Sequence, residues 1–233
     1  ANPKILMGYS DTTTLLTFIN QLGIVTFNGP SIMAGFSQMQ SQSERFMKHV
    51  HDMLFSPADS YTYSPYREYC EGYLEWGDEN NLGKTKEPKP ATGWKTLQGS
   101  GVAKGELFGG CIDVLEFLKG TDFWPARDFW NGKLLFFETS EEKPSVDNVR
   151  WMLRNYGMQG IFDRVSGILF GRPRDYSEAE KASLEAMIRD VVGGEFGKPE
   201  LPVMANMDFG HTDPQIVLPL GVRTRLDCDA ATL

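Results

Sequence analysis

The sequence has little of several features that assign a protein to a class at once. Three of its 233 residues are cysteines and three are histidines. Cys70, Cys111 and Cys228 lie far apart and form no C-x-x-C pair, a spacing that argues against a disulfide framework and suits a reducing, cytoplasmic setting. The cysteines, histidines and carboxylates also show no spacing typical of a metal site, so we expect no metal and no other cofactor.

Positive charge and long apolar runs are also scarce. Lysine and arginine number 23 against 31 aspartates and glutamates, which gives a net charge of −8. No basic patch stands out, and this disfavours a nucleic-acid partner. No apolar run approaches the roughly 18 residues that a membrane-spanning helix needs, and we expect no membrane partner. With 41% hydrophobic and 23% charged residues, the composition is that of an ordinary soluble globular protein.

The sequence does contain alternating strand and helix patterns. Residues 5–8 and 24–27 read as strands, and a helical apolar face lies between them, formed by Leu15, Phe18, Ile19 and Leu22. Strand, helix and strand at this spacing predict a βαβ unit and therefore a parallel sheet. The chain does not begin with methionine and reaches a buried type of strand almost at once. We therefore expect it to begin inside a longer protein.

A second α/β pattern starts near Gly101. Residues 133–138 and 165–171 read as strands, and Ser145 and Ser177 are placed to cap the helices that follow. A further helix is expected at residues 41–55. The predicted fold class is α/β, with the tail of an N-terminal parallel-sheet domain (1–60) followed by a complete C-terminal α/β domain (101–233).

The segment between these parts, residues 61–100, has a different texture. It is rich in proline, glycine, lysine and aromatic residues and shows no periodicity. A stretch of this length without regular structure usually serves as a linker or a binding loop. We expect a partly ordered active-site loop, in which Trp76 either stacks on a planar ligand or anchors the loop itself.

Ser10 lies in "GYSDTTTLL", between a strand and a helix. With Gly8 it forms most of a nucleophile elbow, the G-x-S-x-G turn of many serine hydrolases. Thr12 stands where the elbow needs a very small residue. The simpler interpretation is that Ser10 or Asp11 caps the helix, and we favour it.

Other candidates for chemistry lie near predicted strand ends. Glu138 ends a strand and can orient a histidine, although an exposed glutamate is equally common there. His211, in a loop after a strand, is a candidate general base or a surface residue bonded to a neighbouring aspartate. The backbone N–H groups of Gly109 and Gly110 could hold an anion. The remaining histidines, His49 and His51, are expected to be solvated.

Taken together, several segments resemble the LD-carboxypeptidase family of serine peptidases, and within it the microcin C self-immunity branch. They are "PKILMGYSDTTTLL", "GELFGGCIDVLEFLKGT", "LLFFETSEEKPSVDNVRWML", "GILFGRP" and "DFGHTDPQIVLPLGVRTRLD", in this order over nearly the whole chain. The resemblance implies a two-domain, homodimeric hydrolase with a Ser-Glu-His triad and no metal. Glu138 and His211 match its triad members, and the nucleophile is expected upstream of "GYSD", outside this chain.

The resemblance also implies a substrate class, a peptide-like or aminoacyl-nucleotide small molecule. In the immunity branch, the bond cleaved joins an aminoacyl group to a nucleotide-like phosphoramidate, and Trp76 would match the residue that stacks on adenine. Murein-cleaving relatives, the alternative, commonly have asparagine at the position of Cys111. A third possibility is a non-catalytic binding or dimerisation domain. Without a nucleophile the isolated chain is expected to be inactive, and turnover abolished by Ser10→Ala would overturn that expectation.

Overall fold

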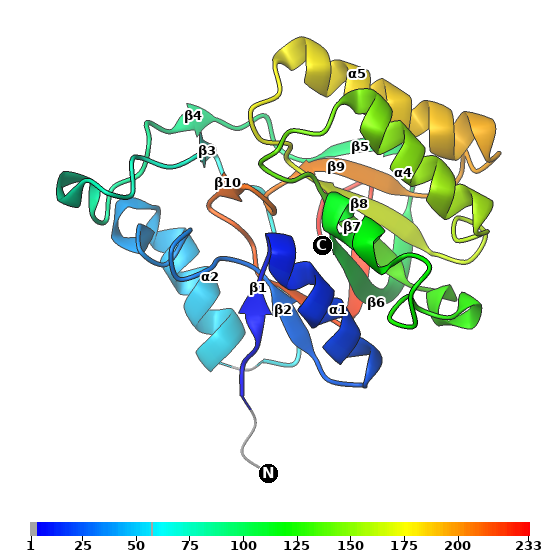
Figure 1. Cartoon of the computed structure of the whole chain (residues 1–233), viewed down its shortest axis with the longest axis horizontal. Helices are drawn as coiled ribbons and strands as arrows, with labels where there is room; N and C mark the ends of the chain where they lie inside the picture. Colours follow the sequence, from blue (N-terminus) through cyan, green and yellow to red (C-terminus); the bar gives the residue numbers. More distant parts are fainter. Residues whose placement is uncertain (1–3, 57) are drawn as a thin grey trace.

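The computed structural model describes residues 4–56 and 58–233, and its centre is a six-stranded mixed sheet (Figure 1). The strand order is β12-β6-β7-β8-β9-β5, with the two edge strands antiparallel to the parallel strands between them. The strands are β5 (Lys95–Gln98), β6 (Val102–Cys111), β7 (Leu134–Glu138), β8 (Gly167–Gly171), β9 (Val203–Met207) and β12 (Arg223–Asp227). The predicted α/β fold is confirmed.

Helices cover one face of this sheet. They are α3 (Ile112–Leu115), α4 (Val146–Met158) and α5 (Glu178–Arg189). Leu135 and Phe137 of β7 pack in one core with Leu153 of α4. The alternate residues, Leu134 and Phe136, face a second core on the other side, as strand geometry requires. Both predicted caps are present, including the reciprocal capping box at the start of α5.

The N-terminal elements form a smaller sheet beside the second core. β1 (Met7–Gly8) and β2 (Thr26–Asn28) are parallel with α1 (Thr13–Gln21) between them, so the predicted βαβ unit is confirmed. β11 (Leu218–Leu220) joins β2 antiparallel. The second helix, α2 (Glu44–Phe55), is capped by Ser43.

The predicted inner face of α1 is wrong. Leu15 and Leu22 are 47% and 64% exposed, whereas Leu16, Thr17 and Asn20 are buried. Polar side chains can be buried here because they are satisfied locally: the Thr17 hydroxyl donates to the Thr13 carbonyl, and the Asn20 amide donates to the Ile24 carbonyl. The spacing of the apolar residues alone therefore predicted the wrong buried face of the helix.

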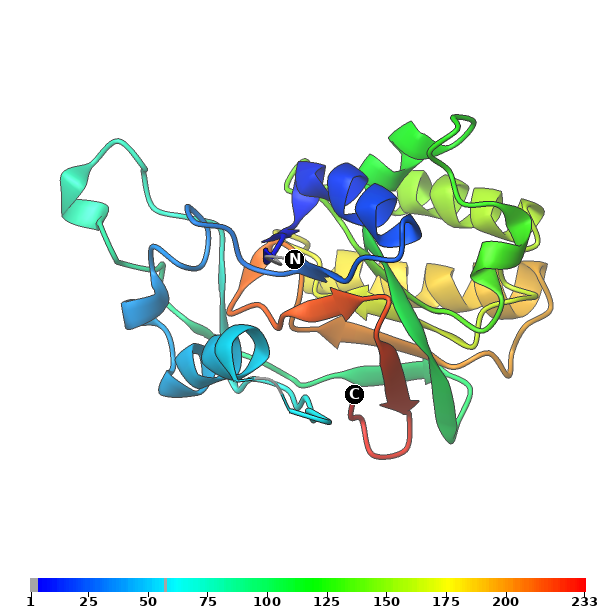
Figure 2. The ribbon, with the colours of Figure 1, turned by 90° about the horizontal axis from the view of Figure 1, so that it is seen from below.

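Residues 61–100 are more ordered than expected. Besides β5, they contain β3 (Glu68–Glu71) and β4 (Lys89–Pro90), which form a small sheet with β10 (Thr212–Asp213). Tyr63, Tyr66 and Trp94 are buried. Between β3 and β4, residues 72–88 project from the body (Figures 1 and 2), and we call this segment the arm. The domain limits at residues 60 and 100 stay a prediction.

Short helical turns complete the described structure. The 3-10 turns are η1 (Ser10–Thr12), η2 (Met39–Ser41), η3 (Glu79–Asn81), η4 (Glu116–Leu118) and η5 (Arg127–Trp130), and α5 continues into the π-helical η6 (Asp190–Glu195). Within residues 4–56 and 58–233, no helix has the length and apolarity needed to cross a membrane.

Candidate active site

His211 lies between a carboxylate and a hydroxyl that are far apart in the sequence. Its Nδ1 is 2.7 Å from Oε2 of Glu138, and its Nε2 is 3.1 Å from Oγ of Ser10. Glu138 and His211 are 1% and 2% exposed. With the Nδ1 proton donated to the carboxylate, Nε2 is free to accept the serine proton. This is the geometry of a serine hydrolase triad.

The capping role predicted for Ser10 is wrong. The helical segment already begins at Ser10, with Tyr9 in the extended capping position, and the Ser10 side chain is bonded to His211 instead. Ser10 has a φ of +57°, which lies in the left-handed region. Residues other than glycine rarely adopt this conformation, and those that do are often found at functional sites.

Thr12 fits into this strained turn because Gly8 makes room for it. A Cβ on Gly8 would lie 2.9 Å from the Thr12 Cγ2. The crowding that seemed to exclude an elbow is therefore relieved on the strand side of the turn rather than two residues after the serine. The signal for this turn in the sequence is therefore Gly8 together with Thr12.

Gly210 brings the loop that carries His211, residues 208–211 after β9, against Glu138. A Cβ on Gly210 would lie 2.7 Å from the Glu138 Cβ, and Gly210 has a φ of +100°, so glycine is required by both space and conformation. The loop after β9 can thus pass close to the end of β7 at Gly210, which places His211 beside the carboxylate.

The buried setting of His211 changes its basicity. Burial by itself lowers the pKa of His211, but the charge of Glu138 and the hydrogen bond to it outweigh burial, and the pKa lies above its usual value of 6.5. The Tyr9 ring packs edge-on against the imidazole, with the ring centroids 4.8 Å apart. The imidazole is therefore held on three sides, by Glu138, Ser10 and Tyr9.

Asp208 anchors the loop that carries His211, and no local pattern in the sequence marks this role. Its carboxylate accepts hydrogen bonds from Arg172 Nη2 at 2.5 Å, from Trp94 Nε1 at 2.8 Å and from the Tyr66 backbone N–H at 3.0 Å. The Arg172 and Asp208 side chains are 1% and 0% exposed. One buried carboxylate therefore joins four segments of the chain.

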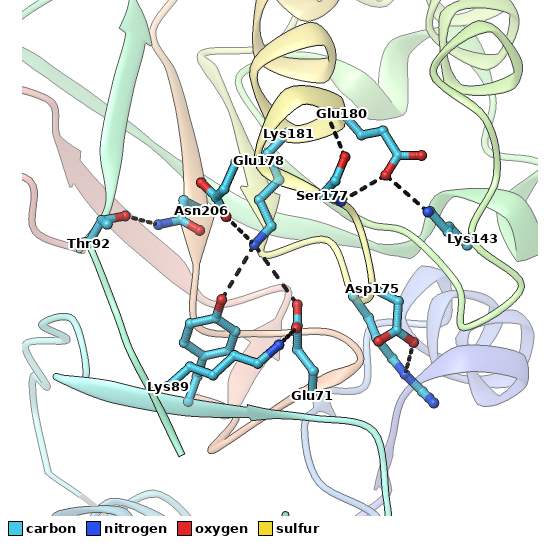
Figure 3. A network of polar contacts seen from close by, with 12 residues as sticks. Glu71, Lys89, Thr92, Lys143, Asp175, Ser177, Glu178, Glu180, Lys181 and Asn206 are labelled. Atoms are coloured by element: carbon cyan, nitrogen blue, oxygen red, sulfur yellow. Dashed lines mark hydrogen bonds and ion pairs between the residues drawn. The ribbon is translucent and has the colours of Figure 1, made fainter. Parts of the chain in front are cut away.

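A polar network links the small sheet to α5 (Figure 3). Lys89 pairs with Glu71, and the Lys181 ammonium lies 3.0 Å from Glu178 and 4.0 Å from Glu71. Because β3 pairs with β10, this network also braces the residues that follow His211.

The other predicted site residues lie in varied settings. Trp76, on the arm, is 47% exposed, and its ring centroid is 5.0 Å from that of Tyr73. A Cβ on Gly109 would clash with the Phe136 carbonyl, and one on Gly110 would clash with Thr13. Close packing therefore explains why glycine occupies both positions. The roles of Gly109, Gly110 and Trp76 in substrate binding stay predictions.

The prediction that His49 is solvated is wrong. His49 is buried, its Nδ1 is 2.9 Å from the Tyr61 hydroxyl, and its Nε2 accepts from the Val217 backbone N–H at 2.8 Å. Burial lowers its pKa to about 4, so it acts as a neutral structural link. His51 is exposed, as expected. No group of three metal-ligating side chains occurs among the described residues.

Comparisons with known proteins find relatives that match nearly the whole chain. The LD-carboxypeptidase C-terminal domain matches residues 104–226, more than half of the chain, and the N-terminal domain of the same family matches residues 1–29. The microcin C7 self-immunity protein MccF of Escherichia coli is 29% identical over 98% of this chain, which spans 64% of that relative. A probable murein peptide carboxypeptidase of Bacillus subtilis is 29% identical over 97% of the chain and 60% of the relative.

Solved structures show the same likeness. An MccF-like protein from Streptococcus pneumoniae in complex with AMP superimposes with a TM-score of 0.86 at 26% identity, over 99% of this chain and 69% of that one. MccF in complex with aspartyl sulfamoyl adenosine gives a TM-score of 0.77 at 25% identity, over 99% and 67% of the two chains.

Proposed function

The chain belongs to the LD-carboxypeptidase family, and from this membership we propose that it carries the complete Ser-Glu-His site of a serine hydrolase that cleaves peptide-like amide bonds. The observation that carries the proposal is the contact series from Ser10 through His211 to Glu138. Ser10 as nucleophile replaces the expectation that the nucleophile lies outside the chain, and the chain is then expected to be active.

The proposed reaction follows from the roles of the three side chains. Ser10 Oγ attacks the carbonyl carbon, and His211 Nε2 accepts its proton and passes it to the leaving nitrogen as the C–N bond breaks. Water then hydrolyses the acyl-serine by the same route in reverse. Glu138 holds the imidazole and stabilises its charged form.

The oxyanion needs N–H donors in this scheme. The backbone N–H of Asp11 follows the nucleophile at the first turn of the helical segment, the position that supplies one donor in other nucleophile elbows. It is therefore the proposed donor within this chain.

The proposed substrate is an aminoacyl nucleotide of the microcin C type. The MccF-like structures bind AMP and aspartyl sulfamoyl adenosine, and Trp76 offers an exposed ring on which a base could stack. The bond cleaved would join the aminoacyl carbonyl to the nitrogen of a nucleotide phosphoramidate. A homodimer and a cytoplasmic location stay predictions.

The alternative substrate is a murein tetrapeptide, cleaved at the L,D-bond before its terminal D-alanine. The Bacillus subtilis relative supports it. A non-catalytic domain is the third candidate.

The direct test is turnover of both substrates by the chain, with Ser10→Ala and a matched exposed serine variant, Ser37→Ala. We expect hydrolysis of an aspartyl-phosphoramidate adenosine, a fall in kcat of at least about 10³-fold for Ser10→Ala, and no change for Ser37→Ala. Labelling of Ser10 by a fluorophosphonate gives a readout that needs no substrate.

Each outcome separates the candidates. Cleavage of the murein peptide alone would replace the nucleotide assignment. Absence of both turnover and labelling would leave a non-catalytic domain, and turnover that survives Ser10→Ala would refute the nucleophile.

A further inference from the structure

A cavity of about 240 Å³ lies beside α5, and none of the three proposed catalytic residues lines it. Its wall is formed by α5, by the ends of β8 and β9, and by the segment between β4 and β5. We call it the α5 cavity, and its lining residues include Thr92, Phe170, Arg172, Lys181, Leu184 and Asn206. Three of them, Thr92, Lys181 and Asn206, are labelled in Figure 3. A volume below the roughly 300–1,000 Å³ of drug-sized sites suits a ligand smaller than a nucleotide.

The large sheet is distorted beside this cavity. Leu169 of β8 pairs with Met204 of β9. Two residues further along β8, Gly171 pairs with Met207, which is three residues further along β9. Strand β9 therefore has one extra residue here, a bulge of the kind that redirects side chains and is common next to functional sites. Asn206 lies inside the bulge with a φ of +58°, a second unusual backbone feature on the wall of the cavity.

Arg172 follows β8, lines the cavity and has an unused hydrogen-bond donor. Its buried side chain donates from Nη2 to Asp208, and its guanidinium carbon lies 4.2 Å from the centroid of the Tyr69 ring. Within residues 4–56 and 58–233, its Nη1 has no hydrogen-bond partner. A buried donor without an acceptor is costly, and a ligand oxygen in the cavity would satisfy it.

Lys181 supplies a second positive charge on the same wall. Its ammonium lies 5.7 Å from the centroid of the Tyr69 ring, so Lys181 and Arg172 border the same ring. The ammonium is 3.0 Å from Glu178, which is 88% exposed. An ion pair with so exposed a carboxylate is weak and can give way to a ligand. Arg172 and Lys181 can therefore donate hydrogen bonds to one anionic group.

The remaining wall indicates what the anionic group is attached to. Phe170, Leu184 and Ile188 are buried apolar residues that line the cavity. Glu185 lines it too, but its carboxylate is paired with the Lys95 ammonium at 2.8 Å. An inorganic anion would leave the apolar side unfilled, whereas a carboxylate on a short hydrocarbon chain would contact both sides.

We propose that the α5 cavity binds a small carboxylate with a short apolar chain, whose oxygens accept hydrogen bonds from Arg172 Nη1 and from the Lys181 ammonium. The site is separate from the triad, and its ligand does not depend on the proposed hydrolase function. Asp208 connects the two sites, because its carboxylate binds Arg172 and anchors the loop that carries His211.

Calorimetric titration with three small probes tests the site. Butyrate carries the proposed carboxylate and chain, n-butylamine has the same chain with the opposite charge, and inorganic phosphate has negative charge without the chain. We expect saturable binding of butyrate and binding of the other two at least about tenfold weaker. In NMR spectra, butyrate should shift the backbone N–H signals of Lys181 and Asn206 and leave that of Ser10 unchanged.

Variants locate the binding site. Lys181→Gln removes one of the two cations, and we expect butyrate to bind at least about tenfold more weakly. Lys198→Gln is the matched control and should not change the affinity, since Lys198 pairs with Asp163 at 2.5 Å and does not line the cavity. Arg172→Lys keeps a cation beside Asp208 but removes Nη1, and it should weaken binding to a similar extent. If this variant does not fold, Lys181→Gln still decides.

The proposal is overturned if butyrate does not bind, or if n-butylamine binds as tightly. Tighter binding of phosphate than of butyrate would overturn the carboxylate assignment. Equal affinities in Lys181→Gln and Lys198→Gln, or a shift at Ser10 without one at Asn206, would place the anion outside the α5 cavity. None of these readouts uses turnover, so a failure of the hydrolase function and a failure of this proposal are distinguishable.

Discussion

The loop that carries His211 and the arm differ in the number of contacts that hold each in place. The loop around His211 is fixed by a buried ion pair, two further N–H donors to Asp208, and a glycine that packs against Glu138. The arm projects from the body, and a hydroxyl contact between Tyr73 and Tyr9 joins its root to the residues beside His211. A firmly held loop suits groups that need fixed proton-transfer distances, and a less firmly held arm suits an adjustable contact with a ligand.

The largest expected effect lies in the fixed region. Glu138→Gln removes the charge that holds His211, and we expect kcat to fall by about 10³- to 10⁴-fold. The activity of the wild type should fall as pH drops through the raised pKa of His211, because a protonated imidazole cannot accept the serine proton. In Glu138→Gln this midpoint should move to lower pH. A midpoint that stays in place would show that Glu138 does not set the basicity of His211.

Substitution of Asp208, which anchors the loop that carries His211, should first affect the stability of the fold. Asp208→Ala leaves the Arg172 guanidinium buried without its carboxylate, and we expect the free energy of unfolding to fall by about 3–5 kcal/mol. Denaturant titration measures this, with Asp52→Ala as control, since its pair with Lys48 is exposed. Equal losses in the two variants would contradict the view that the buried pair anchors the loop.

The smallest effect should come from the arm. Trp76→Ala removes a ring that is nearly half exposed, so stability should hardly change. If the ring stacks on a base, KM for the nucleotide substrate should rise about threefold to tenfold, and KM for a murein peptide should not. A change that is the same for both substrates would assign Trp76 to the arm rather than to the ligand.

The local elements could be predicted because their signals are local. Ser177 and Glu180 lie three residues apart, and their capping box formed as expected. The strand that ends at Glu138 was clear from its apolar run. The inner face of α1 could not be predicted, because the pattern of Leu15 and Leu22 does not say which apolar surface meets the rest of the chain.

The contacts of the candidate site depend on distant parts of the chain. Glu138 and His211 were found through a strand end, a loop and a family resemblance. Asp208 was missed because its partners come from other segments of the chain. Ser10 was assigned to a cap because Thr12 was weighed without Gly8, which makes room for it.

By itself, the sequence determined the main strands of the two α/β segments, the helices α4 and α5 with their caps, and the family. Apolar spacing and capping depend on residues a few positions apart. The family is indicated by five motifs that occur in order along the chain. Only the tertiary structure decided that Ser10 meets His211, since their separation of 201 positions is bridged by the packing of α1 against β6 and by the loop after β9. A hydrogen bond between such distant residues depends on how the sheets pack, which no local pattern records.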